Sequence, residues 1–322
     1  MLAVVESTPD MWRDSFAAAR AAALPAWSVA NVVVCGMGGS GISGDVLSVI
    51  ASTRAAIPVA VVKGVDLPRW AGDETLVICV SYSGDTEETL ACFDVARNRG
   101  AQLAVVAAGG ALEARAAETG VPCIVPTPGG LMPRAAFAAL AASVLVVGER
   151  AGLVPDLDGE INAALDACRE GLGRWRAVVR SDENDAKRLA HALVGTRPHI
   201  WRQEGVLGVA ASRWKTQLNE NAKLHASSAV MPEALHNEIV PLDPGDALVI
   251  LRAEIEKASI AARIDALASY EPWNAWSFGT SDLAILASSV LFGDLVSVYC
   301  AALRGVDPTP IEPIKRLKQA LG

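Results

Sequence analysis

The chain has 322 residues, of which 52% are hydrophobic, 20% charged and 5% aromatic, so it is long enough for two domains with cores built mainly from Ala, Val, Leu and Ile. Its formal net charge of -8 argues against a general binder of nucleic acid or of anionic membranes, because either partner requires a basic face that displaces counterions. A local site for a small phosphate remains compatible with this charge.

The sequence predicts neither a targeting segment nor a disulfide framework. Residues 1–20 carry acidic side chains and lack a basic stretch followed by an apolar core, so we expect no secretory signal. The six cysteines are scattered without a C-x-x-C pair, which is typical of reduced thiols in a cytoplasmic protein. The apolar segment 135–148 is too short to span a membrane, and the segment 283–303 is interrupted by Asp294. Both are predicted to be buried helices of a cytoplasmic protein with no membrane association.

Short apolar runs alternate with helical segments through the first half of the chain. The runs are continuously apolar, as strands covered on both faces are, and they predict βαβ units with a mostly parallel sheet. The predicted strands are 32–35, 59–62, 76–80, 103–106 and 123–125, and the predicted helices are 41–51, 86–99, 112–119 and 134–150.

The second half follows the same plan with a weaker pattern, after a predicted linker at 152–159. Strands are predicted at 199–201 and 247–252, and helices at 211–223, 256–269 and 282–304, followed by a short C-terminal helix that reaches Lys318. The predicted fold class is therefore α/β, with two domains at 1–152 and 153–322. Each domain is expected to hold a mostly parallel sheet flanked by helices.

A glycine-rich loop, G-M-G-G-S-G-I-S-G-D, occupies residues 36–45 directly after the first predicted strand. Glycines let the backbone approach a ligand, and the free N–H groups of a helix start favour anionic or hydroxyl-rich groups. The spacing of Gly36, Gly38 and Gly41 also fits a dinucleotide site. An NAD site favours an acidic residue after the next strand, where this chain has Lys63.

A second loop, S-Y-S-G-D-T-E-E-T at residues 81–89, follows the third predicted strand. It places three hydroxyls, those of Ser81, Ser83 and Thr86, at the start of a helix, where they can hold a terminal phosphate without a lysine. The alternative is an ordinary helix cap made by Asp85 or Thr86. Because a cap needs one hydroxyl and three are present, phosphate binding is the favoured interpretation.

With these loops, the sequence resembles the bifunctional phosphoglucose/phosphomannose isomerases, a family with two sugar-isomerase (SIS) domains. Five motifs in the same order carry the resemblance over almost the whole chain. They are the two loops above, P-R-A-A at 133–136, N-E-N-A-K at 219–223 and P-E-A-L-H-N-E-I at 232–239.

The resemblance implies a hexose 6-phosphate substrate and assigns a role to each matching position. The phosphate-binding hydroxyls fall on Ser81, Ser83 and Thr86, and the sugar-contacting loop on Gly39 and Ser40. The catalytic residues of the family correspond to Glu220, His236, Arg134 and Lys318. The match of the lysine is loose, because Lys315 lies near Lys318.

These residue types suit aldose–ketose isomerisation, which needs a proton-transferring base, a cation near the developing enediolate and a proton donor for the ring oxygen. The resemblance gives these roles to Glu220, Arg134 and His236 respectively. Outside the motif context, Glu220 would be a solvated helix carboxylate, Arg134 a surface charge at a helix start and His236 a turn residue.

No cofactor or metal is predicted. The four histidines show no ligand spacing such as H-x-H or H-E-x-x-H, and no cysteine pair complements them. In the family that the sequence resembles, the counterpart of His236 reaches into the neighbouring subunit, so a homodimer with shared active sites is expected.

Two segments depart from the family pattern. Residues 224–230 read L-H-A-S-S-A-V where a proline and aromatic residues are expected, and Pro241 replaces an expected glycine. These departures leave open a second interpretation, a catalytically weak SIS protein that binds a phosphosugar as a regulator. The presence of Arg134, Glu220 and His236 favours the enzyme, because binding alone needs no base.

Overall fold

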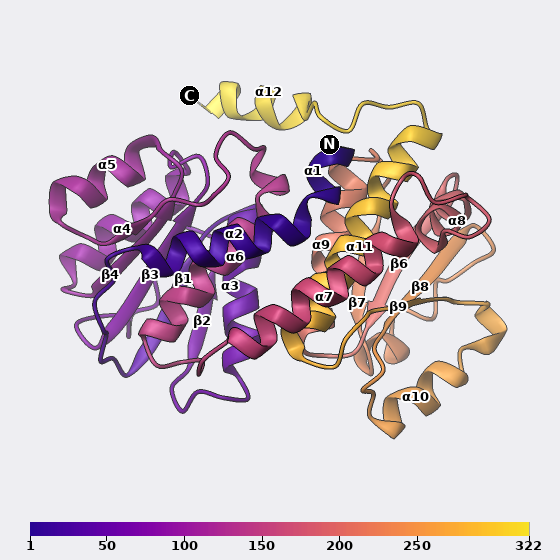
Figure 1. Ribbon diagram of the computed structural model, residues 1–322, viewed down its shortest axis with the longest axis horizontal. Coiled ribbons are helices and arrows are strands. Elements are labelled where there is room, and N and C mark those ends of the chain that lie inside the picture. The colour runs from indigo at the N-terminus through magenta and orange to yellow at the C-terminus, as the bar shows by residue number, and fades with distance from the viewer. Residues whose placement is uncertain (322) are drawn as a thin grey trace. The chain divides into compact units, whose positions relative to one another are not determined.

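The structure is a computed structural model that describes residues 1–321 (Figure 1). The chain divides into two compact units. The first, which we call the N-terminal unit, contains Ser7–Leu165. The second, which we call the C-terminal unit, contains Met1–Glu6 and the residues from Asp166 on.

The N-terminal unit is built on a five-stranded sheet with the order β2-β1-β3-β4-β5, in which every pair of neighbours is parallel. Its central strand β3 is buried at every position, as a strand covered on both faces must be. The strands are β1 (Asn31–Cys35), β2 (Val59–Val62), β3 (Thr75–Ser81), β4 (Gln102–Ala107) and β5 (Cys123–Ile124). The predicted parallel sheet is confirmed.

Helices cover both faces of this sheet (Figure 1). On one face, side chains of β1, β3 and β4 form a core with α4 (Glu87–Asn98) and α5 (Gly110–Thr119). On the other face lie α3 (Gly38–Ala51) and α6 (Phe137–Arg150), with α2 (Thr8–Ala21) packed against α6. Residues 137–148 of α6 are all buried, so the apolar segment predicted as a buried helix is one.

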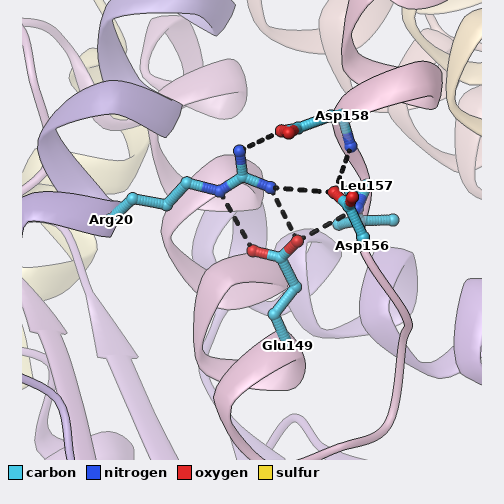
Figure 2. A network of polar contacts seen from close by, with 5 residues as sticks. All are labelled: Arg20, Glu149, Asp156, Leu157 and Asp158. Atoms are coloured by element: carbon cyan, nitrogen blue, oxygen red, sulfur yellow. Dashed lines mark hydrogen bonds and ion pairs between the residues drawn. The ribbon is translucent and has the colours of Figure 1, made fainter.

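An ion-pair network joins the end of α2 to the end of α6 (Figure 2). The Arg20 guanidinium donates to both carboxylate oxygens of Glu149, at 3.1 and 2.7 Å, and also contacts Asp158 at the start of α7 (Asp158–Trp175). Glu149 additionally accepts the Leu157 amide at 3.1 Å. Hydrogen bonding to Glu149 raises the pKa of Arg20 above its usual value. The network fixes α2 and the segment after α6 within the N-terminal unit.

The C-terminal unit contains a four-stranded parallel sheet with the order β7-β6-β8-β9. Its strands are β6 (Arg197–Arg202), β7 (Ser227–Val230), β8 (Asp246–Arg252) and β9 (Trp273–Trp276). Its α-helices are α1 (Leu2–Glu6), α8 (Asp185–Leu193), α9 (Val206–Glu220), α10 (Ala258–Asp265), α11 (Asp282–Leu303) and α12 (Glu312–Leu321), with the short 3₁₀ segments η2 (Glu233–His236) and η3 (Ala268–Tyr270). The core side chains of β6 and β8 pack with α10, while α9 contacts β6 and β8, and α11 contacts α8 and α9.

Helix α11 is the single helix within residues 1–321 that is long and apolar enough to cross a membrane. Its most apolar stretch is completely buried inside the protein. The helix therefore serves as the core of the C-terminal unit, as predicted for residues 283–303.

A buried polar stripe ties α9 to α11. Arg213 is 2% exposed and donates through Nε and Nη2 to the Asp294 carboxylate, at 3.0 and 2.6 Å. Gln217, one turn later, donates to the same carboxylate at 3.1 Å, and Asn221 donates to Ser297 at 3.0 Å. Because these three residues are spaced by four, with Asn221 directly after the last residue of α9, their bonds fix the rotation of the helix about its axis.

Replacing Asp294 with Asn should destabilise the protein by about 3 kcal/mol, because the variant removes the negative charge that the buried Arg213 guanidinium contacts through two hydrogen bonds. Urea unfolding followed by circular dichroism measures the shift in midpoint. Glu170→Gln is the control, since the Glu170–Arg174 pair has side chains that are 50% and 61% exposed, and its removal should change stability by less than about 0.5 kcal/mol. Equal midpoint shifts in the two variants would contradict a stabilising role for the buried pair.

Candidate functional site

The two loops singled out in the sequence lie side by side at the carboxyl edge of the N-terminal sheet. The glycine-rich loop follows β1 and the loop at 81–89, called the hydroxyl loop below, begins at the last residue of β3, which pairs with β1. In the order β2-β1-β3-β4-β5 the chain leaves β1 and β3 toward opposite sides of the sheet. Parallel α/β sheets bind ligands in the crevice at such a switch point.

The hydroxyl loop is a tight turn held by its own side chains. The Ser81 and Thr86 hydroxyls lie 2.9 Å apart, and Ser81 also accepts the Gly84 amide at 3.1 Å. Ser83 accepts the Asp85 amide at 3.4 Å and is exposed. The three predicted hydroxyls therefore share one turn, with Ser81 buried, Thr86 half-buried and Ser83 open to solvent.

Neither residue proposed as an ordinary cap performs that function. Thr86 occupies the N-cap position of α4 without making a side-chain capping bond, because its hydroxyl is directed to Ser81. The Asp85 carboxylate accepts the Ala111 amide at 2.9 Å instead. The first turn of α4 thus has no side-chain cap, and its amides and dipole favour an anion. This geometry supports the phosphate interpretation over the capping one.

The glycine-rich loop contacts both the hydroxyl loop and the P-R-A-A segment. Ser40 accepts the Tyr82 amide at 3.3 Å. A Cβ atom on Gly39 would lie 3.3 Å from the Pro133 carbonyl oxygen and 3.7 Å from the Arg134 Cα, so the absence of a side chain permits this close approach. Arg134 is 5% exposed and lies in η1 (Pro133–Ala135), immediately before α6.

The N-terminal unit therefore gathers six of the predicted site residues around one sheet edge. They are Gly39, Ser40, Ser81, Ser83, Thr86 and Arg134.

The remaining predicted residues belong to the C-terminal unit. Glu220 is half-buried and is the last residue of α9. Lys223, in the left-handed conformation with a φ of 53°, donates to the Glu220 carbonyl at 2.5 Å and to the Pro310 carbonyl at 2.8 Å. The Leu224 amide donates a hydrogen bond to the Leu218 carbonyl at 3.1 Å. These bonds, with the buried stripe of α9, hold the backbone that carries Glu220.

His236 is exposed and ends η2, the 3₁₀ turn that follows β7. The Ile239 amide, which follows the turn in the chain, donates to the Ala234 carbonyl at 3.2 Å and stabilises the turn. Lys318 is part of α12, but its side chain lies outside the described residues. The alternative, Lys315, is exposed and pairs with Glu312 at 2.9 Å.

Known proteins match this chain over nearly its full length. A bifunctional phosphoglucose/phosphomannose isomerase from Caldicellulosiruptor bescii is 34% identical over 90% of this chain and 89% of its own. One of the same name from Aquifex aeolicus is 32% identical over 90% of both chains. The family model of the bacterial phospho-glucose isomerase C-terminal SIS domain matches residues 182–321. The chain belongs to the bifunctional phosphoglucose/phosphomannose isomerase family.

Solved structures agree on the fold. The C-terminal domain of glucosamine-fructose-6-phosphate aminotransferase from Francisella tularensis superposes with a TM-score of 0.74 at 14% identity, covering 95% of this chain and 96% of that one. The expected fold class, α/β with two SIS-type domains, is confirmed for this isomerase family member.

The departures from the family pattern fall in peripheral structure of the C-terminal unit. Residues 224–230 include β7, which pairs with β6 from His199↔Ser227 to Arg202↔Val230 at the edge of the sheet. The segment is anchored before the strand, where Asn219 accepts the Ala226 amide at 2.9 Å. Pro241 lies in an exposed turn before β8. Within residues 1–321 there is also no cluster of three or more His, Cys, Asp or Glu side chains arranged to hold a metal ion.

The sequence interpretation missed the polar residues that support Glu220. Arg213, Gln217 and Asn221 recur every four residues and continue into the N-E-N motif. Polar residues at this spacing, on a helix face that is otherwise apolar, were the signal in the sequence that could have predicted a buried polar contact. It also missed Tyr82, which stands between two predicted phosphate-binding serines.

Replacing Gly84 with Ala should destabilise the N-terminal unit strongly. Gly84 has a φ of 76°, and a Cβ atom there would lie 1.7 Å from the Gly109 carbonyl oxygen, so the hydroxyl loop would have to move. Gly100→Ala is the matched control, because Gly100 has a φ of 74° with open space around it and should lose only about 1–2 kcal/mol. Thermal unfolding of both variants measures the difference, and a similar midpoint for the two would show that the loop tolerates the displacement.

Proposed function

We propose that this chain is an aldose–ketose isomerase that interconverts glucose 6-phosphate and mannose 6-phosphate with fructose 6-phosphate through a cis-enediol. The observation that carries the proposal is the start of α4, which has no side-chain cap, at the same sheet edge as the glycine-rich loop and the buried Arg134 next to that loop. A phosphate-binding edge with an adjacent cation fits a sugar phosphate whose carbonyl end acquires negative charge. Membership of the isomerase family supports the same conclusion.

The phosphate group is held by uncharged donors in this proposal. Ser81, Ser83 and Thr86 donate hydroxyl protons to it, and the first amides of α4 add their dipole. Gly39 and Ser40 contact the sugar. Because the phosphate takes no part in the reaction, its binding energy serves to place C1 and C2 of the sugar correctly.

Glu220 is assigned the proton transfer. The carboxylate removes the proton from C2 of either aldose and returns it to C1, and the reverse reaction starts from fructose 6-phosphate. Glucose 6-phosphate and mannose 6-phosphate differ only at C2, so loss of that proton gives the same cis-enediol from both. The C2 protons of the two epimers lie on opposite faces, so one base on the fixed end of α9 serves both provided that the intermediate rotates about C2–C3.

Arg134 and His236 complete the chemistry. The buried guanidinium of Arg134 stabilises the enediolate oxygen, and burial strengthens this interaction because water does not screen it. His236 donates a proton to the ring oxygen when the sugar opens, with Lys318 assisting. No metal or organic cofactor is required for these steps.

The exposure of His236 fits a residue that acts on a second copy of the chain. We therefore propose a homodimer in which His236 of each subunit completes the site of the other. A cytoplasmic location fits the sugar-phosphate substrate.

Incubating the protein with fructose 6-phosphate should yield both glucose 6-phosphate and mannose 6-phosphate. In Glu220→Gln, turnover should fall by roughly 10²- to 10⁴-fold while the Michaelis constant changes little, since the variant keeps the shape but loses the base. Glu170→Gln, at an exposed position of α7, controls for removal of a carboxylate. Near-normal turnover in Glu220→Gln would exclude the assignment of the base, whereas hexose 6-phosphate binding without turnover in the wild type would favour the regulatory alternative.

The shared site predicts complementation between two inactive variants. Glu220→Gln and His236→Ala should each be nearly inactive alone. When they are co-expressed, the mixed dimer contains one site with both wild-type residues, so measurable isomerase activity should return. Light scattering of the wild type checks for the dimer. A mixed sample that forms dimers but stays inactive would place His236 in its own subunit's site.

A further inference from the structure

Tyr82 lies in the hydroxyl loop between Ser81 and Ser83, but its side chain forms hydrogen bonds with a different segment of the chain. The residue is 6% exposed. Its phenol oxygen accepts the Leu131 amide at 2.9 Å and donates to the Pro128 carbonyl at 3.2 Å. The hydroxyl thus makes two bonds to one short stretch of backbone, between β5 and η1.

That stretch leads directly to Arg134 and has little else to fix it. Residues 128–130 are exposed, and Gly129 and Gly130 are consecutive, so the backbone has wide conformational freedom there. Ser15 contacts the Thr127 carbonyl at the start of the stretch. Tyr82 holds it on both sides of the glycine pair.

The backbone of Tyr82 is fixed independently of its hydroxyl. Its amide donates to Ser40 at 3.3 Å, and its carbonyl accepts the Ala108 amide at 3.2 Å. The ring of a phenylalanine can remain in the same buried position. Loss of the hydroxyl alone would therefore release residues 128–131 while leaving the serines on either side in place.

We propose that Tyr82 is a positioning residue whose hydroxyl fixes Arg134 relative to the phosphate-binding hydroxyls. This inference rests on the proposed function, in which Arg134 meets the enediolate while Ser81, Ser83 and Thr86 hold the phosphate. The distance between these groups must match the length of the sugar, and displacement of a catalytic group by about 1 Å can lower the rate as much as 10²-fold. Tyr82 ties the two groups together through a single side chain.

Tyr82→Phe should lower kcat about 10-fold and change the Michaelis constant for fructose 6-phosphate less than threefold, since the phosphate contacts persist. Tyr299→Phe is the matched control. Tyr299 is 8% exposed, and its hydroxyl donates to the Trp175 carbonyl at 2.6 Å within the C-terminal unit, so this variant loses a comparable buried bond. Its kcat should stay within twofold of the wild type.

A double-mutant cycle tests whether Tyr82 acts through Arg134. In an Arg134→Lys background, Tyr82→Phe should lower kcat less than twofold, because the group that it positions is already altered. Full additivity of the two losses, or an unchanged kcat in Tyr82→Phe alone, would overturn the positioning role while leaving the isomerase assignment intact.

Calorimetric binding separates this inference from the proposed function. Arabinonate 5-phosphate carries a carboxylate that resembles the enediolate, whereas sorbitol 6-phosphate carries the phosphate without an anionic reacting end. Tyr82→Phe should weaken the first about 10-fold and the second less than twofold. If the wild-type protein showed no isomerase turnover but Tyr82→Phe still had these unequal effects on binding, the positioning role would be supported and the isomerase function rejected. Equal effects of Tyr82→Phe on the binding of both ligands would reject the positioning role.

Discussion

The parallel pairing of β1 with β3 is the constraint on which the candidate site residues of the N-terminal unit depend. The register from Asn31↔Thr75 to Cys35↔Cys79 brings the loops that follow these strands to the same edge of the sheet. The glycine-rich loop can then approach Pro133, and Ser40 can accept the Tyr82 amide. A shift of the register by one residue would turn the side chains of β3 to the opposite faces and misplace Ser81. The core of aliphatic residues on both faces of the sheet therefore also fixes the geometry of the polar site above it.

Much of the fold was predictable because buried parallel strands are continuous apolar runs. The prediction for β2 has the same bounds as the strand, Val59–Val62, and those for β1, β3, β4 and β5 differ by one residue at one or both ends. The strands β7 and β9 were not predicted. Their sequences, S-S-A-V and W-N-A-W, are four residues long and partly polar, and they form the two edges of the second sheet. An edge strand packs on fewer neighbours, so its composition carries a weaker signal.

The bounds of α9 differ from those that the sequence pattern predicted. The predicted helix over 211–223 begins at Val206 in the structure, because Gly205, with a φ of 95°, turns the chain into the helix earlier. It ends at Glu220, and Lys223, which has a positive φ, donates one side-chain hydrogen bond to the Glu220 carbonyl. Among the site residues, types and spacing identified the hydroxyl loop. They could not show that Thr86 bonds to Ser81 and leaves α4 without a side-chain cap, because that depends on the conformation of the loop. Nor could they show that Tyr82 reaches Leu131, because these two residues are distant in sequence.

Under the proposed function, the division of labour between neutral and charged groups has a physical reason. The phosphate stays charged throughout the reaction, so a lysine in the hydroxyl loop would stabilise the ground state and the transition state equally and add nothing to turnover. The enediolate charge exists only near the transition state, and a buried cation that meets it there lowers the barrier selectively. Arg134 is the positively charged residue that the N-terminal unit buries beside the glycine-rich loop, at 5% exposure. Neutral donors therefore suit the constant charge of the phosphate, and a fixed guanidinium suits the transient charge of the enediolate.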